Sequence, residues 1–230
     1  MRHDARKMQT KPYGQGGGKL STKQAYSRDN KVVSRFKELE QQLERTEQQL
    51  RLFQKISRFM VRELSLAEVL QGIVGLVGEF LACDSCLLYL INNGELVLCA
   101  SKPQHPAQMG KVRLKMSEGL TGWVARERRL LAISRETYND PRFKYFSDLP
   151  EDTFESFLSA PVIARNRVVG VINVQYRAPH GWSGSEMELL TTVGEQVGCL
   201  LVLSRMPPTA VEEANHVELV LASGPVGQQP

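Results

Sequence analysis

The segment from Phe157 to Tyr176 constrains the fold more than any other stretch of the chain. Two runs rich in Val and Ile flank a short polar break at residues 164–167, and this pattern favours two strands joined by a tight reversal. The segment therefore predicts the central β-hairpin of an antiparallel sheet. Gly170 interrupts the second run, which is typical of a bulge or of a close approach by another backbone. Asn173 and Gln175 alternate with apolar residues, so one face is more polar than a core requires, as expected over a small cavity.

Helices and short strands are predicted around this hairpin. Ser65 and Glu68 form a capping-box pattern that opens a helix, and Ser183 and Glu186 repeat the pattern before the last helix. The other expected elements are strands at Ser85–Ile91, Glu95–Ala100, Lys111–Lys115 and Leu130–Ser134, and a short helix that begins near Ser117. We expect an α+β fold, an antiparallel sheet of about six strands with helices packed on one face, preceded by a long coiled-coil helix.

A heptad pattern indicates that coiled coil. Its two apolar positions are occupied by Phe36, Leu43, Leu50, Ser57 and Leu64, and by Val32, Leu39, Thr46, Phe53 and Met60. Four-then-three spacing with Glu, Gln, Lys and Arg between is typical of a coiled coil. We expect residues 31–64 to pair with a second copy in a parallel homodimer. The alternative is an amphipathic helix that lies on its own domain. The two interpretations are compatible if the first part of the helix pairs with a second copy and its last turns dock on the domain.

The two ends of the chain are not expected to belong to the folded domain. Residues 1–30 combine basic residues with Gly, Gln and Ser, which predicts a disordered basic tail. A basic arm would suit nucleic acid or an acidic partner, but Tyr13 and Tyr26 are too few for base stacking, and nucleic-acid binding is the less favoured interpretation. Residues 207–230 are expected to form a mostly disordered C-terminal tail, which leaves residues 65–206 as the folded domain.

Membrane, metal and redox functions are not expected. No apolar run approaches the roughly 18 residues of a membrane span, and the basic N-terminus lacks the apolar core of a signal peptide, so we expect a cytoplasmic protein. Cys83 and Cys86 form a CxxC, but no second CxxC or His pair stands at zinc-ligand spacing. The motif closes a predicted helix rather than opening one, which favours buried structural cysteines. No metal or cofactor is expected.

The order of the elements and several motifs resemble a GAF domain. The motifs are Ser117–Ala125, similar to the family's turn into its short helix, Asn139–Phe143, similar to the loop that follows, and Phe157–Val162 with Val169–Asn173, similar to the central hairpin. Within the family, Asp140–Phe146 and the hairpin are most similar to the GAF domain at the N-terminus of nitrogen-branch phosphotransferase Enzyme I. The resemblance covers about Leu52–Ser204. No phosphotransfer domain follows within the sequence, so phosphoenolpyruvate chemistry is not expected.

The resemblance implies a ligand site between the sheet and the loops that cover one of its faces. The residues it implies are Trp123, Asn139, Arg142, Phe143, Tyr145, Ser159, Asn173 and Gln175. A guanidinium such as that of Arg142 can pair with a carboxylate or a phosphate, and the amide side chains can bind an amide or an amino acid. The alternative is that these residues fill a closed core and pin the loop.

Catalysis is not expected. GAF-type free methionine sulfoxide reductases carry a catalytic cysteine where this chain has Thr121, and bilin attachment would need a Cys-His pair that the sequence lacks. Within the domain, haem would have only His105 and His180, both in predicted loops. We expect a non-enzymatic signal-transduction sensor that binds an amino acid or another small metabolite and signals through its coiled coil to an unidentified protein. The alternative is a structural adaptor that dimerises and recruits a partner without a ligand.

Overall fold

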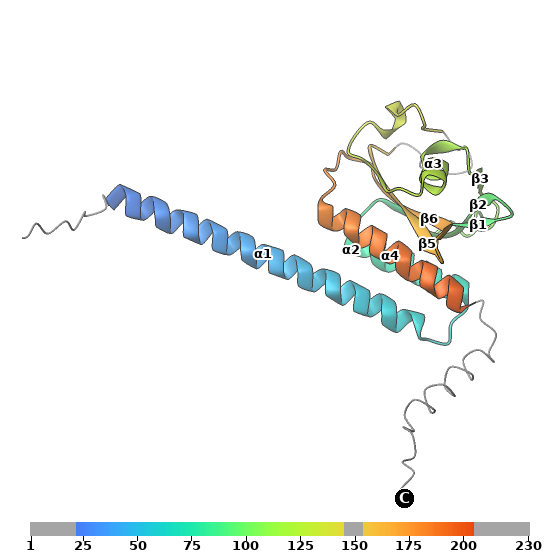
Figure 1. Ribbon diagram of the computed structural model, residues 1–230, viewed down its shortest axis with the longest axis horizontal. Helices are drawn as coiled ribbons and strands as arrows, with labels where there is room; N and C mark the ends of the chain where they lie inside the picture. Colours follow the sequence, from blue (N-terminus) through green and yellow to red (C-terminus); the bar gives the residue numbers. More distant parts are fainter. Residues whose placement is uncertain (1–21, 145–153, 205–230) are drawn as a thin grey trace, which may run out of the picture. The chain divides into compact units, whose positions relative to one another are not determined.

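The computed structural model describes residues 22–144 and 154–204 (Figure 1). Its elements are α1 (Thr22–Met60), α2 (Leu66–Phe80), β1 (Ser85–Asn92), β2 (Glu95–Lys102), β3 (Arg113–Lys115), α3 (Gly119–Glu127), β4 (Leu131–Ile133), a 3-10 turn (Thr137–Asn139), β5 (Ser156–Ala164), β6 (Arg167–Tyr176) and α4 (Gly184–Leu203). They divide into two units, Met1–Gln48 and Gln49–Pro230, each described by itself. The predicted tail at residues 207–230 lies outside the described residues, as does the tail up to residue 21.

The sheet of the second unit is antiparallel throughout and has the strand order β3-β2-β1-β6-β5-β4. The predicted six-stranded sheet and its central β5–β6 hairpin are therefore confirmed. Both tight hairpins turn through left-handed backbone, as the twist of paired strands favours. The β1–β2 turn uses Asn93 and Gly94, with φ of 51° and 82°, and the β5–β6 turn uses Arg165 and Asn166, with φ of 47° and 61°.

The two faces of the sheet are covered differently (Figure 1). Ile172 and Val174 of β6 belong to the main core, which they share with buried residues of α2 and α4. Val171 belongs to a second core with Val124 and Ala125 of α3. The expectation of helices on one face holds for α2 and α4, and the short helix α3 covers part of the opposite face. Both predicted capping boxes are present, at Ser65 and Ser183.

Close packing between α4 and β5 depends on two glycines. A Cβ atom at Gly194 would lie 3.0 Å from the carbonyl oxygen of Pro161, and one at Gly198 would collide with that of Ile163. Gly170 in β6 likewise has no room for a side chain, because the Tyr89 carbonyl oxygen of β1 occupies that space. This is the close backbone approach that the strand glycine predicted.

Helix α1 differs in part from the expectation for residues 31–64. It begins at Thr22, so residues 22–30, expected to belong to the disordered tail, are helical, and it ends at Met60. In the second unit its last turns bury Leu52 and Ile56 in the main core, as the docking alternative proposed. Earlier in the helix, the heptad residues Phe36, Leu39 and Leu43 are 62%, 57% and 62% exposed. None of the described helices combines the length and hydropathy of a membrane span.

Two glycine substitutions test the packing of α4 on β5. Gly198→Ala should lower the free energy of unfolding by about 1–3 kcal/mol, because the new methyl group overlaps the β5 backbone. Gly75→Ala in α2 is the matched control, since no atom outside its own helix lies within 4 Å of the added Cβ. There, helix propensity alone should raise stability by about 1 kcal/mol. Urea unfolding measures both, and equal gains in the two variants would contradict the packing.

Candidate ligand site on the α3 face of the sheet

Polar side chains form a row on the face of β6 that α3 covers. Because side chains alternate along a strand, Asn173 and Gln175 point away from the α2–α4 layer, to which Ile172 and Val174 contribute. Ser159 of β5 is the register partner of Asn173 and lies on the same face. Ser159 is fully buried, Asn173 is 2% exposed and Gln175 is 9% exposed. The structure thus brings three predicted site residues together in a buried setting.

A hydrogen-bonded chain joins this row to α3. The Ser159 hydroxyl donates to Asn173 Oδ1 at 2.7 Å, and Asn173 Nδ2 donates to Thr121 Oγ1 at 2.8 Å. Thr121 is itself buried on α3. Buried polar groups are usually paired in this way, because an unpaired one loses its bonds to water without replacement. The chain fixes the Asn173 amide and anchors α3 over the centre of the sheet.

Gln175, the last residue of this row, differs from Ser159 and Asn173 in its hydrogen bonding. Its Oε1 atom is buried and has no hydrogen-bond partner among the residues that the structure describes. Its register neighbours across the sheet are Ser85 on β1 and Phe157 on β5. A buried carbonyl oxygen without a donor is costly, so the acceptor is available to a ligand with an N–H or O–H group.

Arg142 is held at the edge of α3 by two contacts. Its guanidinium lies over the Trp123 ring, 4.5 Å from the ring centroid, and it binds the Asp140 carboxylate through Nε at 2.8 Å and Nη2 at 2.6 Å. The hydrogen bonds from Arg142 lower the pKa of the Asp140 carboxyl, against the opposing effect of partial burial. The charge of Arg142 therefore already has a carboxylate partner two residues away.

The other predicted loop residues are more dispersed. Asn139 is exposed, and its Nδ2 donates to Glu136 Oε2 at 3.3 Å. Phe143 is half-buried. The next residue, Lys144, forms an ion pair of 2.9 Å with Glu118 at the start of α3, and its hydrogen bond lowers the pKa of that carboxyl. Tyr145 lies outside the described residues.

Groups that could carry out catalysis are scarce in the described part of the chain. Thr121, at the position of the reductase cysteine, uses its hydroxyl to accept from Asn173. Burial raises the pKa of the Cys83 thiol to about 11 and also raises the pKa of Cys86 and Cys99, which disfavours the reactive thiolate. Over residues 22–144 and 154–204, no group of three His, Cys, Asp or Glu side chains is placed to hold a metal ion.

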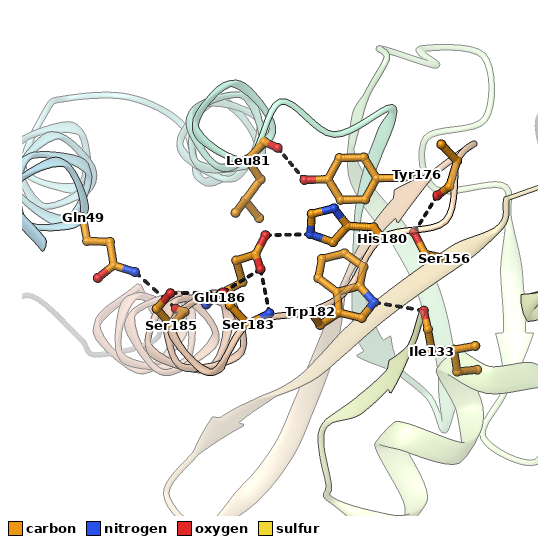
Figure 2. Close-up of polar contacts among 11 residues, drawn as sticks. Gln49, Leu81, Ile133, Ser156, Tyr176, His180, Trp182, Ser183, Ser185 and Glu186 are labelled. Carbon is orange, nitrogen blue, oxygen red and sulfur yellow. Dashed lines mark hydrogen bonds and ion pairs between the residues drawn. The ribbon is translucent and has the colours of Figure 1, made fainter. Parts of the chain in front are cut away.

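An aromatic cluster lies beyond the end of β6, and its residues are labelled in Figure 2. The His180 ring stacks on Tyr176 with centroids 4.3 Å apart, and Trp182 packs edge-on against His180 at 4.6 Å. The Tyr176 hydroxyl donates to the Leu81 carbonyl at the end of α2, while Trp182 Nε1 donates to the Ile133 carbonyl of β4 at 2.9 Å. The cluster therefore ties the end of β6 to the end of α2 and to the edge strand β4 of the same sheet.

Glu186 connects this cluster to α4. Its Oε1 lies 2.8 Å from His180 Nε2, and its Oε2 accepts from the backbone and hydroxyl of Ser183 at 2.8 Å and 2.6 Å (Figure 2). Partial burial acts to raise the pKa of Glu186, but the bonds from Ser183 and His180 outweigh it, so the pKa is lowered. One residue earlier, the Ser185 carbonyl accepts from Gln49 Nε2 of α1 at 3.2 Å.

Sequence reasoning did not assign Thr121, Asp140 or this cluster to the site or its surroundings. Asp140 had a local signal, since a carboxylate two residues from Arg142 is within reach of its guanidinium. Thr121 was singled out only as the position of the reductase cysteine, since its partner Asn173 is 52 residues away. In the aromatic cluster, Trp182 bonds a carbonyl 49 residues away, and no pattern indicated the contacts of His180 with its sequence neighbours. The capping box at Ser183 was predicted, but not the contact of its glutamate with His180.

The Glu186 carboxylate makes stability depend on pH. Because its folded-state pKa is lowered, its contribution is complete above the ordinary Glu pKa of about 4.3 and is lost as the pH falls through the lower folded-state value. Glu186→Gln should cost about 1 kcal/mol at pH 7, and the difference from wild type should shrink as the pH falls below about 4. Glu188→Gln, exposed on the same helix, is the control. Chemical denaturation across this range measures both, and a pH-independent loss for Glu186→Gln would be the contrary result.

Comparisons with known proteins identify the family. The GAF domain family model matches residues 65–201, more than half of the chain. The GAF domain of an Acinetobacter phosphoenolpyruvate-protein phosphotransferase is 28% identical, with a TM-score of 0.62 over 68% of this chain and 93% of that one. The corresponding Coxiella burnetii domain is 25% identical, with a TM-score of 0.65 over 69% and 95%. These two similarities confirm the expected resemblance to phosphotransferase GAF domains.

A more distant likeness shows the fold alone. The free methionine-R-sulfoxide reductase of Neisseria meningitidis is 16% identical, with a TM-score of 0.57 over 67% of this chain and 88% of that one. The comparison with curated proteins returned no match. The family assignment therefore depends on the GAF model and on the phosphotransferase domains. This chain belongs to the GAF domain family.

Proposed function

We propose that the protein is a non-enzymatic sensor whose GAF domain binds a small metabolite on the α3 face of the sheet. GAF domains are in general sensory, ligand-binding signalling domains, which agrees with this class of function. The observation that carries the proposal is the buried Oε1 of Gln175, which has no hydrogen-bond partner within residues 22–144 and 154–204. A bound N–H or O–H group would supply the missing hydrogen bond, so an amino acid or another small metabolite with such a donor is the ligand we expect.

The surroundings of Gln175 support a small polar ligand. The neighbouring amide of Asn173 is fixed by Ser159 and Thr121, so a ligand would meet a pre-organised polar surface rather than order one at a cost in entropy. Trp123 and Arg142 stack on each other at α3 and provide an aromatic and cationic boundary. Binding by Arg142 itself would require a ligand anion to share or replace Asp140.

Transmission of the signal would start from the same strand. Gln175 is adjacent in sequence to Tyr176, which stacks on His180, and His180 contacts Glu186 at the start of α4. The next contact is that of Ser185 with Gln49 of α1. We propose that a ligand shifts the population between two arrangements of these helices, and that the coiled coil of a homodimer passes the change to a protein partner.

A lack of enzymatic activity is part of the proposal. The position of the reductase cysteine is Thr121, which is engaged in the buried hydrogen-bonded chain. The raised pKa of the buried Cys83, Cys86 and Cys99 thiols also disfavours thiol chemistry. These features support a binding role for the α3 face.

A structural adaptor is the second candidate, and specific contacts favour it. Ser159, Asn173 and Thr121 satisfy one another, and Arg142 is neutralised by Asp140, as in a closed core that pins its loop. In that case the domain would dimerise and recruit a partner with no metabolite. The two candidates differ in whether any compound stabilises the folded domain.

A thermal-shift screen against amino acids, 2-oxo acids and cyclic nucleotides tests the ligand. A compound at 100 times its dissociation constant should stabilise the protein by about 2.7 kcal/mol. Gln175→Met should abolish this shift while leaving the free protein as stable as wild type or more so, because it removes an unpaired buried acceptor. Gln196→Met is the matched control. Gln196 Oε1 of α4 is also buried without a hydrogen-bond partner in the described part of the chain, but it lies outside the proposed site.

The outcomes of this screen separate the candidates. If no compound raises the melting temperature, the structural adaptor is favoured over the metabolite-binding sensor. If a compound stabilises wild type and Gln175→Met equally, a ligand exists but Gln175 does not bind it, and the assignment of the site is wrong.

The proposed dimer is tested by charge on the exposed heptad stripe. Leu39→Asp with Leu43→Asp should convert a dimer to a monomer in light scattering, because aspartates at facing seam positions repel and cannot be buried. Both leucines are more than half exposed in the single chain, so the GAF domain should remain folded. Gln41→Asp with Gln48→Asp, on the outer face of the same heptads, should leave the dimer intact. A leucine double variant that stays dimeric would refute the coiled-coil interface.

A further inference from the structure

The end of α3 and the turn between β5 and β6 meet at one place on the surface. Arg128, the C-cap residue of α3, donates from Nη2 to the Asn166 carbonyl oxygen at 2.7 Å and to Asn166 Oδ1 at 2.8 Å. Asn166 is a central residue of the β5–β6 turn. This contact brings together the arginines of two segments, here named the arginine cluster: Arg126, Arg128, Arg129, Arg165 and Arg167.

The arginine cluster carries uncompensated positive charge. All five side chains belong to exposed residues, and Arg126 pairs with Glu127 at 2.9 Å. For the other four, no ion pair is present among the described residues. Guanidinium groups on adjoining segments repel one another unless an anion lies between them. Every cation of the cluster is arginine rather than lysine, and arginine presents the planar fork of donors that matches a carboxylate bidentately.

The backbone beneath the cluster does not favour arginine. Arg128 and Arg165 have left-handed φ values of 57° and 47°, a conformation that glycine and asparagine adopt at lower cost. In the β1–β2 turn of the same domain, Asn93 stands at the position equivalent to Arg165. The fold alone would therefore be served better by small residues at these sites. Strained backbone conformations of this kind are found most often at functional sites, where the side chain is needed for binding.

We propose that the arginine cluster is a docking surface for an acidic segment of a partner protein. Residues 126–130 and 164–168 contain no aromatic side chain on which nucleic-acid bases could stack. The cluster is also confined to one helix end and one turn rather than forming a stripe along an extended groove, so aspartate and glutamate side chains fit it better than a nucleic-acid backbone. The surface is distinct from the proposed ligand site, although α3 carries residues of both, Thr121 and Arg128.

A charge-removing variant that suits the backbone tests this surface. Arg165→Asn with Arg167→Thr places asparagine in the left-handed turn and a β-branched residue at the start of β6. Binding of a short fluorescent poly-glutamate peptide to the full chain, measured by anisotropy at low and moderate salt, should weaken by at least about tenfold, equivalent to about 1.4 kcal/mol. The melting temperature should stay equal or rise, so a loss of binding cannot be attributed to unfolding.

The control removes the same charge elsewhere. Arg58→Gln with Arg135→Gln should leave peptide affinity unchanged, and the basic N-terminal residues are present in every variant, so the difference reports the cluster. The proposal is overturned if the wild-type protein does not bind the peptide, or if both double variants lose affinity equally. It is also overturned if duplex DNA binds more tightly than the peptide and loses affinity with Arg165→Asn and Arg167→Thr, which would assign the surface to nucleic acid.

Discussion

Strand β6 is buried on both faces, and the alternation of its side chains decides where the rest of the domain packs. It pairs with β1 on one side and β5 on the other. A slip of one residue in either register would turn Asn173 and Gln175 towards the α2–α4 layer and expose Ile172 and Val174 to the polar side. The absence of a side chain at Gly170, where the β1 backbone approaches, makes the register with β1 specific.

The two faces of β6 differ in what packs on them. On one face, glycines bring α4 against the backbone of β5, and the Tyr176–His180–Glu186 contacts continue from the strand to the start of α4. On the other face, the short helix α3 covers a polar row. Helix α3 is bonded to that row at Thr121 and to the β5–β6 turn at Arg128. The proposed ligand site and the proposed docking surface thus share one small element, α3 with its C-cap residue.

Local signals in the sequence were sufficient for most of the fold. The capping boxes and the apolar alternation of the hairpin each involve residues a few positions apart, and the structure confirms them. The heptad pattern was less decisive, because α1 carries two apolar stripes. Leu52 and Ile56 lie off the predicted seam and dock on the domain, whereas Phe36, Leu39 and Leu43 on the seam remain exposed. A single helix sequence does not reveal which stripe meets which partner.

The candidate site was predictable only where strand geometry governs it. The period of two placed Asn173 and Gln175 on one face of the hairpin, whereas Ser159 was implied by the family resemblance, and the register places it opposite Asn173. The pairing of Asn173 with Thr121, and the engagement of Arg142 by Asp140 and Trp123, depend on how α3 and its loop pack. That packing is set by tertiary contacts, which no local pattern encodes.

The most direct test of a ligand on this face is an NMR titration. Mixtures of amino acids or of 2-oxo acids are added to the protein, and the side-chain amide resonances are followed. The account predicts that the Gln175 amide resonances shift on saturation and that those of Asn173 follow, since the two residues lie in the same row. The exposed amide of Asn139 should shift less. Saturable binding that leaves Gln175 and Asn173 unperturbed while moving resonances elsewhere would contradict the account.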